Sequence, residues 1–524
     1  MAHVVLFTDR APEQRHRYGK KLNSIRYNYS AGAYKLATVI RAAGFEVLVV
    51  PNCLSLSFAG IQKIIRHNSK NLLWVGISTT LMLSHAPDWD TYRNKWLTNN
   101  EDFVDPGLLF NTTNDMKTIQ GQMPWGYKEL EEISKWLTNY NAPLLLGGAV
   151  VTEFLNGGLR TLDKNTYIVR GNSELYVVNF TVERSKDINF KPMYVNNNTE
   201  YDNNIFKTSI IKWENNDLID SDDWLPIEIA RGCAFSCAYC TYEHKGRFDL
   251  FKDPKILRNE LIRNYDLYGV TKYTLVDDLY NDSKNKVRIL YDEVWSKLPF
   301  KPEWTAYMRL DMFWADPESI EIIEASGAVY GTLGIETLHD VAGRKVGKGL
   351  GKRRIIETLE TIKAKWQDRV LLNSQFIAGL PDEPYEHIRE SMEWCSTTDL
   401  LHSISWNPLF IAPPVGVRHT DRNSKIGLDN NRYGITWNNR VWTNNVGVSF
   451  TMADNLVSEY YKKMDGNYRV NFGNYSDLRS AGLTHKDITT LPKTPVSQLP
   501  LEELGEVLET KTHNRLNKIL NKTD

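Results

Sequence analysis

Apolar residues in the first third of the chain form short continuous runs separated by stretches of helical periodicity. Five of these runs are expected to be β-strands, at Val4–Phe7, Phe45–Val50, Leu72–Ile77, Pro143–Leu146 and Tyr167–Gly171. Two intervening stretches, Ala31–Ala43 and Ile61–His67, place apolar residues on one face of a helix. Continuously apolar strands that alternate with helices are typical of a parallel sheet buried on both faces. The pattern therefore predicts an α/β fold that begins with a doubly wound, Rossmann-type parallel sheet.

A second and more regular alternation of strands and helices begins after Trp224. Its six expected strands are Ile227–Ala230, Lys272–Val276, Trp304–Met308, Val329–Ile335, Val370–Ile377 and Ser403–Phe410. The expected helices between them are Pro254–Tyr268, Lys284–Leu298, Pro317–Ser326, Lys352–Trp366 and Glu386–Ser396. Six such units predict an open parallel (β/α)6 barrel, in which functional side chains follow the carboxyl ends of the strands.

The pattern also suggests where the domains begin and end. We expect the first sheet at 1–182, a polar connector at 183–223, the barrel at 224–415 and a carboxyl-terminal region at 416–524. The connector is rich in Asn, with a hairpin expected around Ile205–Lys212, and the last 30 residues look helical and charged. Residues 81–125 form a long insertion that could cover a substrate entrance or serve as an exposed flap, and it holds Trp89, Trp96 and Trp125.

Composition narrows the classes of protein. The chain has 63 basic and 64 acidic residues, a formal net charge of −1, so its overall charge indicates neither a nucleic-acid partner nor an acidic lipid surface. No apolar run approaches the length of about 18 residues that a membrane span needs. The amino terminus reads as a buried strand without the basic region of a signal peptide. We expect a cytoplasmic protein.

Three of the five cysteines, Cys233, Cys237 and Cys240, lie within eight residues. Three closely spaced thiolates can hold three irons of a 4Fe–4S cube and leave the fourth iron open to a small molecule. The same cysteines could instead join His244 in a structural zinc site. A disulfide is a poor interpretation because the cysteine count is odd and cytosolic thiols stay reduced. Cys53 and Cys395 are expected to be ordinary buried thiols.

The Cys-x3-Cys-x2-Cys spacing resembles the signature of the radical S-adenosylmethionine (SAM) enzymes. Residues at the ends of later barrel strands strengthen that resemblance, in the segments Asp277-Asp278, Arg309, Gly334-Ile-Glu336-Thr, Lys345-Val-Gly-Lys-Gly349 and Gly379-Leu-Pro. Each could also be a helix cap, a surface cation or a turn, but their joint order behind the cysteine loop matches the family. The resemblance implies that the three cysteines hold the cluster and that SAM contacts Tyr239, Asp277, Asp278, Arg309, Gly334, Glu336 and Gly379.

The first third resembles the cobalamin-binding domain that precedes many radical SAM domains. The resemblance rests on Ser78-Thr79 after the third strand and Gly147-Gly148 after the fourth, which would let a nucleotide tail pack against the backbone. Domains that supply a lower axial ligand carry Asp-x-His-x-x-Gly after the first strand, and the loop Thr8–Gly19 lacks that spacing. Either cobalamin binds without a histidine ligand, or the fold is kept without the cofactor.

The resemblance implies a radical SAM enzyme that reductively cleaves SAM to a 5′-deoxyadenosyl radical and functionalises a C–H bond. Cobalamin-dependent methyl transfer to an unactivated carbon is the leading reaction. Cobalamin-independent rearrangement, cyclisation or oxidation is the alternative, and a zinc-stabilised binding protein is an alternative of a different class. The implied partners are a flavodoxin- or ferredoxin-like electron donor and an organic substrate, with nucleic acid not indicated. In the family, regions like 416–524 cap the barrel mouth and contact substrate.

Overall fold

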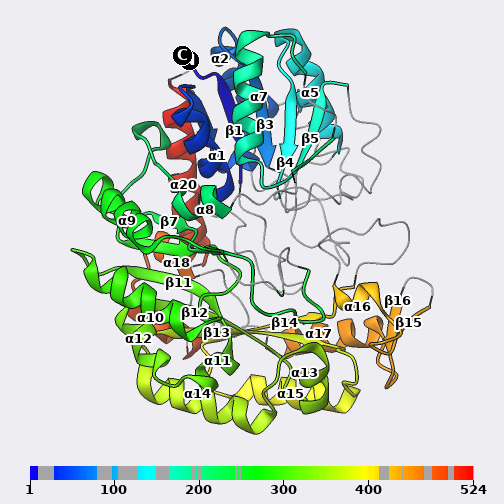
Figure 1. The fold of residues 1–524 in the computed structure, drawn as a ribbon. Helices are drawn as coiled ribbons and strands as arrows, with labels where there is room; N and C mark the ends of the chain where they lie inside the picture. The colour runs from blue at the N-terminus through cyan, green and yellow to red at the C-terminus, as the bar shows by residue number, and fades with distance from the viewer. Residues whose placement is uncertain are drawn as a thin grey trace.

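The protein is built on two six-stranded parallel sheets, one in each half of the chain (Figure 1). A computed structural model describes residues 1–9, 29–78, 97–98, 100–103, 127–148, 164–191, 195–198, 203–241, 246, 250–411, 424–438, 441–464, 475–493 and 501–522. No helix among these residues is long and apolar enough to cross a bilayer. The two halves pack on each other through one continuous apolar core that runs from the first sheet into the barrel.

The first sheet has the strand order β2-β1-β3-β4-β5-β6, with every neighbouring pair parallel. Its strands are β1 (Val4–Phe7), β2 (Val47–Val50), β3 (Trp74–Ser78), β4 (Leu144–Gly147), β5 (Thr166–Gly171) and β6 (Val195–Asn198). This is the flavodoxin-like order, in which the order of the strands reverses between β1 and β3 and leaves a crevice at their carboxyl ends. The predicted doubly wound sheet is confirmed.

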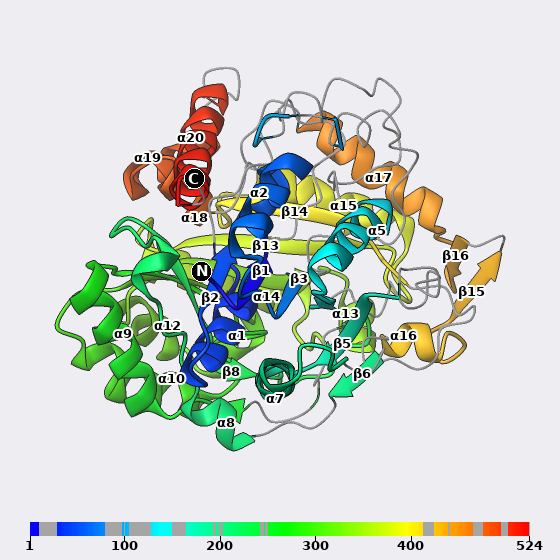
Figure 2. The same cartoon turned by 90° about the horizontal axis from the view of Figure 1, so that it is seen from above.

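Helices cover both faces of this sheet. On one face lie α1 (Ala31–Ala42) and α7 (Glu174–Lys186), which share a core with β1 and β3. On the other lie α2 (Phe58–Asn68), α5 (Tyr127–Leu137) and the carboxyl-terminal helix α20 (Leu501–Leu520). The carboxyl-terminal helix was expected, but its place against the first sheet was not, because nothing in a charged helix identifies the face that it covers. Figures 1 and 2 show both termini close together beside this sheet.

The second sheet has the order β14-β13-β12-β11-β10-β7 and is also parallel throughout. Its strands are β7 (Trp224–Ile227), β10 (Lys272–Leu275), β11 (Glu303–Met308), β12 (Ala328–Glu336), β13 (Leu371–Ala378) and β14 (Ser403–Pro408). Its helices are α9 (Pro254–Tyr268), α10 (Lys284–Glu293), α11 (Leu310–Ala315), α12 (Ser319–Ala325), α13 (Asp340–Val346), α14 (Lys352–Trp366) and α15 (Tyr385–Thr397). The predicted open (β/α)6 barrel is confirmed.

Helix α9 shows how closely local signals set some boundaries. The Asp253 carboxylate accepts hydrogen bonds from the backbone N–H of Lys255 at 2.8 Å and of Ile256 at 3.4 Å, Pro254 occupies the first turn, and Gly269 ends the helix with a φ of 69°. A capping carboxylate, a first-turn proline and a left-handed glycine are the standard start and stop signals of a helix. The predicted limits of α9 are therefore met at both ends.

Three local expectations differ from the structure. The first barrel strand ends at Ile227, and Ala230–Arg231 instead forms a short strand, β8, antiparallel to β9 (Leu250–Phe251). The hairpin expected around Ile205–Lys212 is wrong, because this segment begins as helix α8 (Asn203–Thr208). The first sheet gains a sixth strand, β6, from the Asn-rich stretch. Its sequence, Val-Asn-Asn-Asn, has no apolar alternation, so only pairing with β5 makes it a strand.

The carboxyl-terminal region divides between the two ends of the barrel and the first sheet. Near the carboxyl ends of the strands lie α16 (Lys425–Leu428), the hairpin β15 (Ile435–Asn438) and β16 (Val441–Asn444), and α17 (Phe450–Lys463). In contrast, α18 (Tyr475–Ser480) and α19 (His485–Thr490) pack against the amino-terminal ends, where Tyr475 contacts the rings of Trp224 and Tyr330. Among the described elements of this region, α16, the hairpin and α17 therefore lie on the side of the barrel where a cap was expected.

Candidate functional site

The three clustered cysteines lie in the loop that follows β7 and β8, at the carboxyl end of the barrel sheet. Cys237 is buried, Cys233 and Cys240 are half-buried, and none of the three forms a disulfide. Gly232, with a φ of 94°, turns the chain into this loop, a conformation that favours glycine. Burial raises the pKa of Cys233 to about 11, so this thiol needs a positive neighbour or a metal to become a thiolate.

Arg309 supplies a positive charge at Cys237. Its Nη1 donates a hydrogen bond to Cys237 Sγ at 3.2 Å, and its guanidinium lies 3.7 Å from the ring centroid of Phe235 in the same loop. Asp311 accepts two hydrogen bonds from this guanidinium at 2.8 and 2.5 Å. Burial alone would lower the pKa of Arg309, but Asp311 raises it above its usual value, so the cation is fixed. Arg309, which the family resemblance places at SAM, thus contacts the cysteine loop directly.

The turn between α13 and α14 packs against the other side of the cysteine loop. The backbone N–H of Ala238 donates to Val346 O at 2.9 Å, and Arg309 Nη2 donates to Gly347 O at 3.2 Å. Gly347 ends α13 with a φ of 85°. A side-chain carbon at Gly347 would stand 3.7 Å from Cys237 Cα, which shows how closely the two backbones approach.

Glu336 brings three of the predicted site residues together. Tyr239 donates its hydroxyl hydrogen to Glu336 Oε1 at 2.8 Å, and Lys348 Nζ lies 3.4 Å from the same oxygen. Lys348 also donates to Gly334 O at 2.7 Å, and a side chain at Gly334 would collide with both Glu336 and Lys348. Burial and the Glu336 charge hold the pKa of Tyr239 well above its ordinary value. Glu336 has a φ of 70°, a strained conformation that is often stored at functional sites.

Gly379 lies where the next strand ends, under a residue from the carboxyl-terminal region. Its φ is 89°, and a side chain there would run into the ring of Trp442 in β16. The carboxylate of Glu383, which is 0% exposed, accepts hydrogen bonds from Gly379 N and Leu380 N at 3.2 Å and also from Thr337 Oγ1. Burial raises the pKa of Glu383 to about 7. This carboxylate ties the end of β12 to the end of β13.

Asp277 and Asp278 differ in burial. Asp277 is buried, and its Oδ1 accepts hydrogen bonds from Ile229 N at 2.8 Å and Ala230 N at 2.7 Å. It therefore holds the backbone that leads into the cysteine loop, and burial raises its pKa to about 7. Asp278 is half-buried beside it.

Three cysteine thiols form the candidate donor set at the carboxyl end of the barrel sheet. Among the residues that the structure describes, no group of three or more His, Cys, Asp or Glu side chains is gathered closely enough to hold one metal ion. A tetrahedral zinc site requires all its ligands on one ion, whereas a 4Fe–4S cube places each cysteine on a different iron. The donor set of three cysteines beside a buried guanidinium thus fits a cluster. His244, the fourth ligand of the zinc alternative, lies outside the described residues.

A cavity of about 340 Å³ lies at the carboxyl edge of the first sheet. The parallel pairing of β3 with β4 places Ser78 opposite Gly147, and both line this cavity together with Gly148. The rest of its wall is largely apolar and comes from Leu6, Phe7, Leu36, Trp74, Ile77, Leu145, Val169 and Val177. A mostly apolar pocket of about 300 Å³ or more with a few polar groups is typical of a small-molecule or cofactor site. Thr79 lies outside the described residues.

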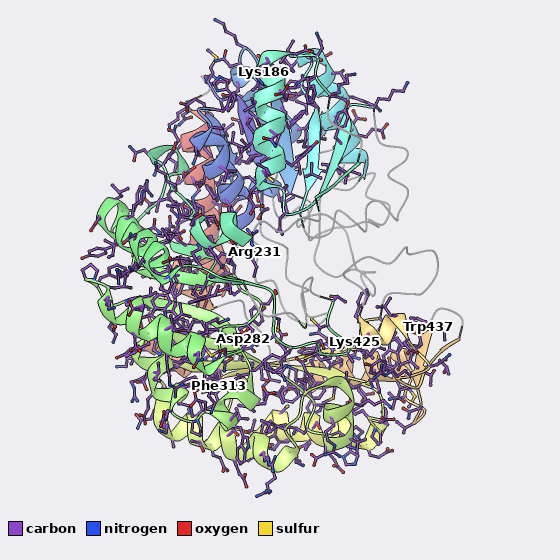
Figure 3. The ribbon with its side chains drawn as sticks, in the orientation of Figure 1. Lys186, Arg231, Asp282, Phe313, Lys425 and Trp437 are labelled. Carbon is purple, nitrogen blue, oxygen red and sulfur yellow. The ribbon has the colours of Figure 1, made fainter. Side chains whose placement is uncertain are left out.

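Charged side chains at this cavity connect it to the cysteine loop. Lys35 of α1 donates to Glu228, and Arg231 forms ion pairs with Glu228 at 2.5 Å and with Glu174 of α7 at 2.6 Å. All four side chains line the cavity. Arg231, which Figure 3 labels, lies two residues before Cys233 in the chain. Burial alone would raise the pKa of Glu228, but Lys35 and Arg231 lower it to about 2. The network contains two positive and two negative side chains.

Sequence reasoning missed several residues that shape the site. Glu383, Asp311 and Trp442 were not singled out from the sequence, because each acts through its contact with a motif residue rather than through a motif of its own. A signal was available for Glu383, since it follows Gly379-Leu-Pro by two residues. The tryptophans of the 81–125 insertion and most of the Thr8–Gly19 loop lie outside the described residues.

A comparison with known protein families matches residues 227–395 to the radical SAM superfamily. That range contains the cysteine loop, Arg309, Glu336 and Gly379, the residues that the fold brings together at the carboxyl end of the barrel. The matched range, about a third of the chain, covers most of the barrel, so the barrel is similar to a radical SAM domain.

Curated relatives match about a third of this chain, and several solved structures match most of it. The anaerobic magnesium-protoporphyrin IX monomethyl ester cyclase of Cereibacter sphaeroides is 26% identical over 188 residues, which are 35% of this chain and 30% of the cyclase. The radical SAM methyltransferase TsrM from Kitasatospora setae, solved with cobalamin and a [4Fe–4S] cluster, matches with a TM-score of 0.59 at 12% identity over 98% of this chain and 100% of that one. The cobalamin-dependent enzyme OxsB, with aqua-cobalamin bound, matches with a TM-score of 0.52 at 13% identity, over 82% of this chain and 56% of its own. At these identities the two structures share the fold of this protein.

Proposed function

We propose that this radical SAM enzyme binds a 4Fe–4S cluster, SAM and cobalamin, and transfers a methyl group to an unactivated carbon of an organic substrate. One observation carries the proposal: Glu228 and Arg231 connect the apolar cavity of the first sheet to the cysteine loop of the barrel. Both residues line the cavity, and the chain continues from them directly into the cysteine loop. The names of the structural neighbours TsrM and OxsB support the same combination of cofactors.

In this proposal the barrel residues hold the cluster and orient SAM. Cys233, Cys237 and Cys240 bind three irons, and the Arg309 guanidinium stabilises the thiolate of Cys237 through a charge-assisted hydrogen bond. SAM lies against Tyr239 of the cysteine loop and against residues at the carboxyl ends of the barrel strands, namely Asp278, Gly334, Glu336 and Gly379. When bound, the cluster supplies the electron that splits SAM and cobalamin supplies a carrier for the methyl group.

The residues of the first sheet hold cobalamin in the cavity. Gly147 and Gly148 let a ligand approach the backbone, and Ser78 offers a hydroxyl at the same edge, with Thr79 next to it in the chain. The loop Thr8–Gly19 after β1 lacks the Asp-x-His-x-x-Gly spacing of domains that supply a lower axial ligand. We therefore propose that the protein binds cobalamin without a histidine as lower ligand. An oxygen-sensitive cluster suits the reducing cytoplasm, where a flavodoxin- or ferredoxin-like protein donates the electron.

The first experiment is anaerobic reconstitution with iron and sulfide, followed by incubation with SAM and dithionite and measurement of 5′-deoxyadenosine. We expect product from the wild type and none from Cys237→Ala, because removing one ligand removes the cluster. Cys395→Ala is the matched control, since Cys395 is a buried thiol in α15, outside the cysteine loop. Equal product from both variants would contradict the assignment of the cluster ligands.

A second measurement tests cobalamin independently. Protein reconstituted with hydroxocobalamin and passed through a desalting column should retain the cobalamin absorption spectrum. A cluster-loaded protein that cleaves SAM but retains no cobalamin would instead favour the cobalamin-independent alternative of rearrangement, cyclisation or oxidation.

A further inference from the structure

Basic residues are concentrated in one short segment beside the cysteine loop. Residues 340–354, which span α13, the turn after it and the start of α14, contain six Lys or Arg and a single acidic residue, Asp340. The whole chain is balanced, with 63 basic and 64 acidic residues. A local excess of this size in a neutral protein creates a positive surface potential that its net charge does not reveal.

Most of these cations face solvent rather than the active site. Lys348 points inward to Gly334 and Glu336, whereas the other five are exposed, at Arg344, Lys345, Lys352, Arg353 and Arg354. We call these five residues the basic surface. The carboxylate of Asp340 accepts a hydrogen bond from the backbone N–H of Lys352 at 2.8 Å, so its charge is directed at the start of α14.

Two neighbouring acidic residues reduce the charge of the basic surface only in part. Asp382 lies 3.4 Å from Lys345, and Glu357 pairs with Arg353 at 2.9 Å while the Arg353 side chain stays 77% exposed. Exposed pairs of this kind are weak and exchange readily with other partners. The guanidinium of Arg354 lies 5.3 Å from the ring centroid of Trp314, an aromatic residue that is itself 42% exposed.

The end of α13 and the turn after it connect the basic surface to the cysteine loop. The turn that joins Arg344 and Lys345 to Lys352 contains Val346 and Gly347. Val346 O accepts the hydrogen bond from Ala238 N, and the Gly347 backbone approaches Cys237 Cα. A partner seated on the basic surface would therefore be separated from the cysteine loop by a single turn of chain.

We propose that the basic surface is the docking site for an acidic one-electron carrier protein of the flavodoxin class, an inference that rests on the function proposed above. The redox step is one electron: the flavin of the donor is oxidised by one electron and the cluster at Cys237 is reduced by one. Transient electron-transfer complexes bury little area and depend on charge complementarity for their rate of association. A positive surface with an exposed aromatic residue, next to the site that needs the electron, fits such a partner.

The test uses full-length reconstituted enzyme and a flavodoxin as probe. The triple variant Lys352→Glu, Arg353→Glu and Arg354→Glu is compared with a second triple variant, Arg66→Glu, Lys70→Glu and Lys186→Glu. These control residues are exposed on α2, the turn after it and α7, around the first sheet. Figure 3 shows Lys186 at the far end of the molecule. Both triple variants change the net charge by the same amount. The readouts are the Kd for flavodoxin by calorimetry without SAM, and 5′-deoxyadenosine formation driven either by flavodoxin hydroquinone or by dithionite.

We expect the first triple variant to weaken flavodoxin binding at low salt by at least about tenfold, since interfacial charges act mainly on association. The difference should shrink at an ionic strength of about 0.3 M because salt screens exposed charges. Dithionite-driven product and iron content should stay at the wild-type level, and the control variant should bind flavodoxin like the wild type.

Unchanged binding in the first variant, or an equal loss in both, would overturn the proposal. The salt dependence of wild-type binding provides a second test that needs no variant, and affinity that does not fall with salt would also overturn it. If the wild type forms no product with dithionite, the proposed function fails, while the binding measurement still reports on docking.

Discussion

The cavity of the first sheet and the cysteine site of the barrel use opposite physical means to prepare for a ligand. The cavity is lined by apolar side chains and glycines, and its few charges pair with one another at one side. The cysteine site is built from buried ions, with Arg309 held by Asp311 and Glu336 contacted by Lys348 and Tyr239. The first offers shape and apolar surface, whereas the second offers fixed charge in a place that excludes water.

This difference has a consequence for how each site tolerates change. Apolar contacts are individually weak and shared among many neighbours, so a pocket loses affinity gradually as it is filled or emptied. A buried ion that loses its partner is left uncompensated, which is costly at once. Substitutions in the cysteine site should therefore have larger effects than substitutions of similar size in the cavity.

The largest effect should come from Arg309→Met. The change removes the cation beside Cys237 and leaves the Asp311 carboxylate without its guanidinium partner, while keeping a long apolar side chain. We expect cluster affinity to fall by about 10- to 100-fold, the usual cost of losing a residue that supports a metal ligand. Iron and sulfide content after anaerobic reconstitution measures it. Arg288→Met is the control because Arg288 pairs with Asp316 and Glu318 at the protein surface, and iron loss of equal size there would contradict the prediction.

A smaller effect should come from Gly32→Leu in α1, which lines the cavity. A side-chain carbon at this position meets no atom within 4 Å, so leucine can enter the open space without a clash. We expect cobalamin affinity to fall by roughly tenfold, as apolar volume meant for the ligand is taken. Retained cobalamin absorption measures this loss.

The control for Gly32→Leu is Ala42→Leu, at an exposed position in the last turn of the same helix. Leucine is a good helix former, so neither change should weaken α1 and stability should hold. Iron content should stay at the wild-type level in both proteins. A loss of cluster in Gly32→Leu would show that the two sites are not separable.

The smallest effect should be on stability as a function of pH. Burial raises the pKa of Glu383 to about 7, above the value of about 4.3 in an unfolded chain. The stability contributed by its protonated form is present below pH 4.3 and is lost as pH rises through 7. We expect a loss on the order of 1 kcal/mol between pH 5 and 8, which Glu383→Gln should abolish in thermal unfolding of the apoprotein.

The matching change beside the cavity should have the opposite pH dependence. Lys35 and Arg231 lower the pKa of Glu228 to about 2, so its contribution is present above pH 4.3 and is lost as pH falls toward 2. Glu228→Gln should therefore alter the acid side of the stability profile and leave the slope between pH 5 and 8 unchanged. Identical profiles for both variants would contradict the contrast between the two regions.

The sequence by itself determined the architecture and the cysteine site. Strand and helix periodicity predicted both parallel sheets, and the caps of α9 fixed its limits to the residue. Cys233, Cys237 and Cys240 are close in the chain, so their proximity in space needed no tertiary information. The ends of successive parallel strands meet at one edge of a sheet, which is why Arg309, Glu336 and Gly379 could be assigned to the same site in advance.

Only the tertiary structure decided the rest, because the relevant contacts join segments far apart in the chain. The Asn-rich segment β6 is a strand because it pairs with β5. Helix α20 lies where it does because it is buried against the first sheet, and its Arg515 donates a hydrogen bond to Asp223 at 3.2 Å, across 292 residues of chain. The Trp442 ring packs against Gly379, and Arg231 lies between the cavity and the cysteine loop. No local motif predicts either contact. Periodicity reports which face of an element is buried, but the partner that buries it depends on the shape and charge of the folded whole.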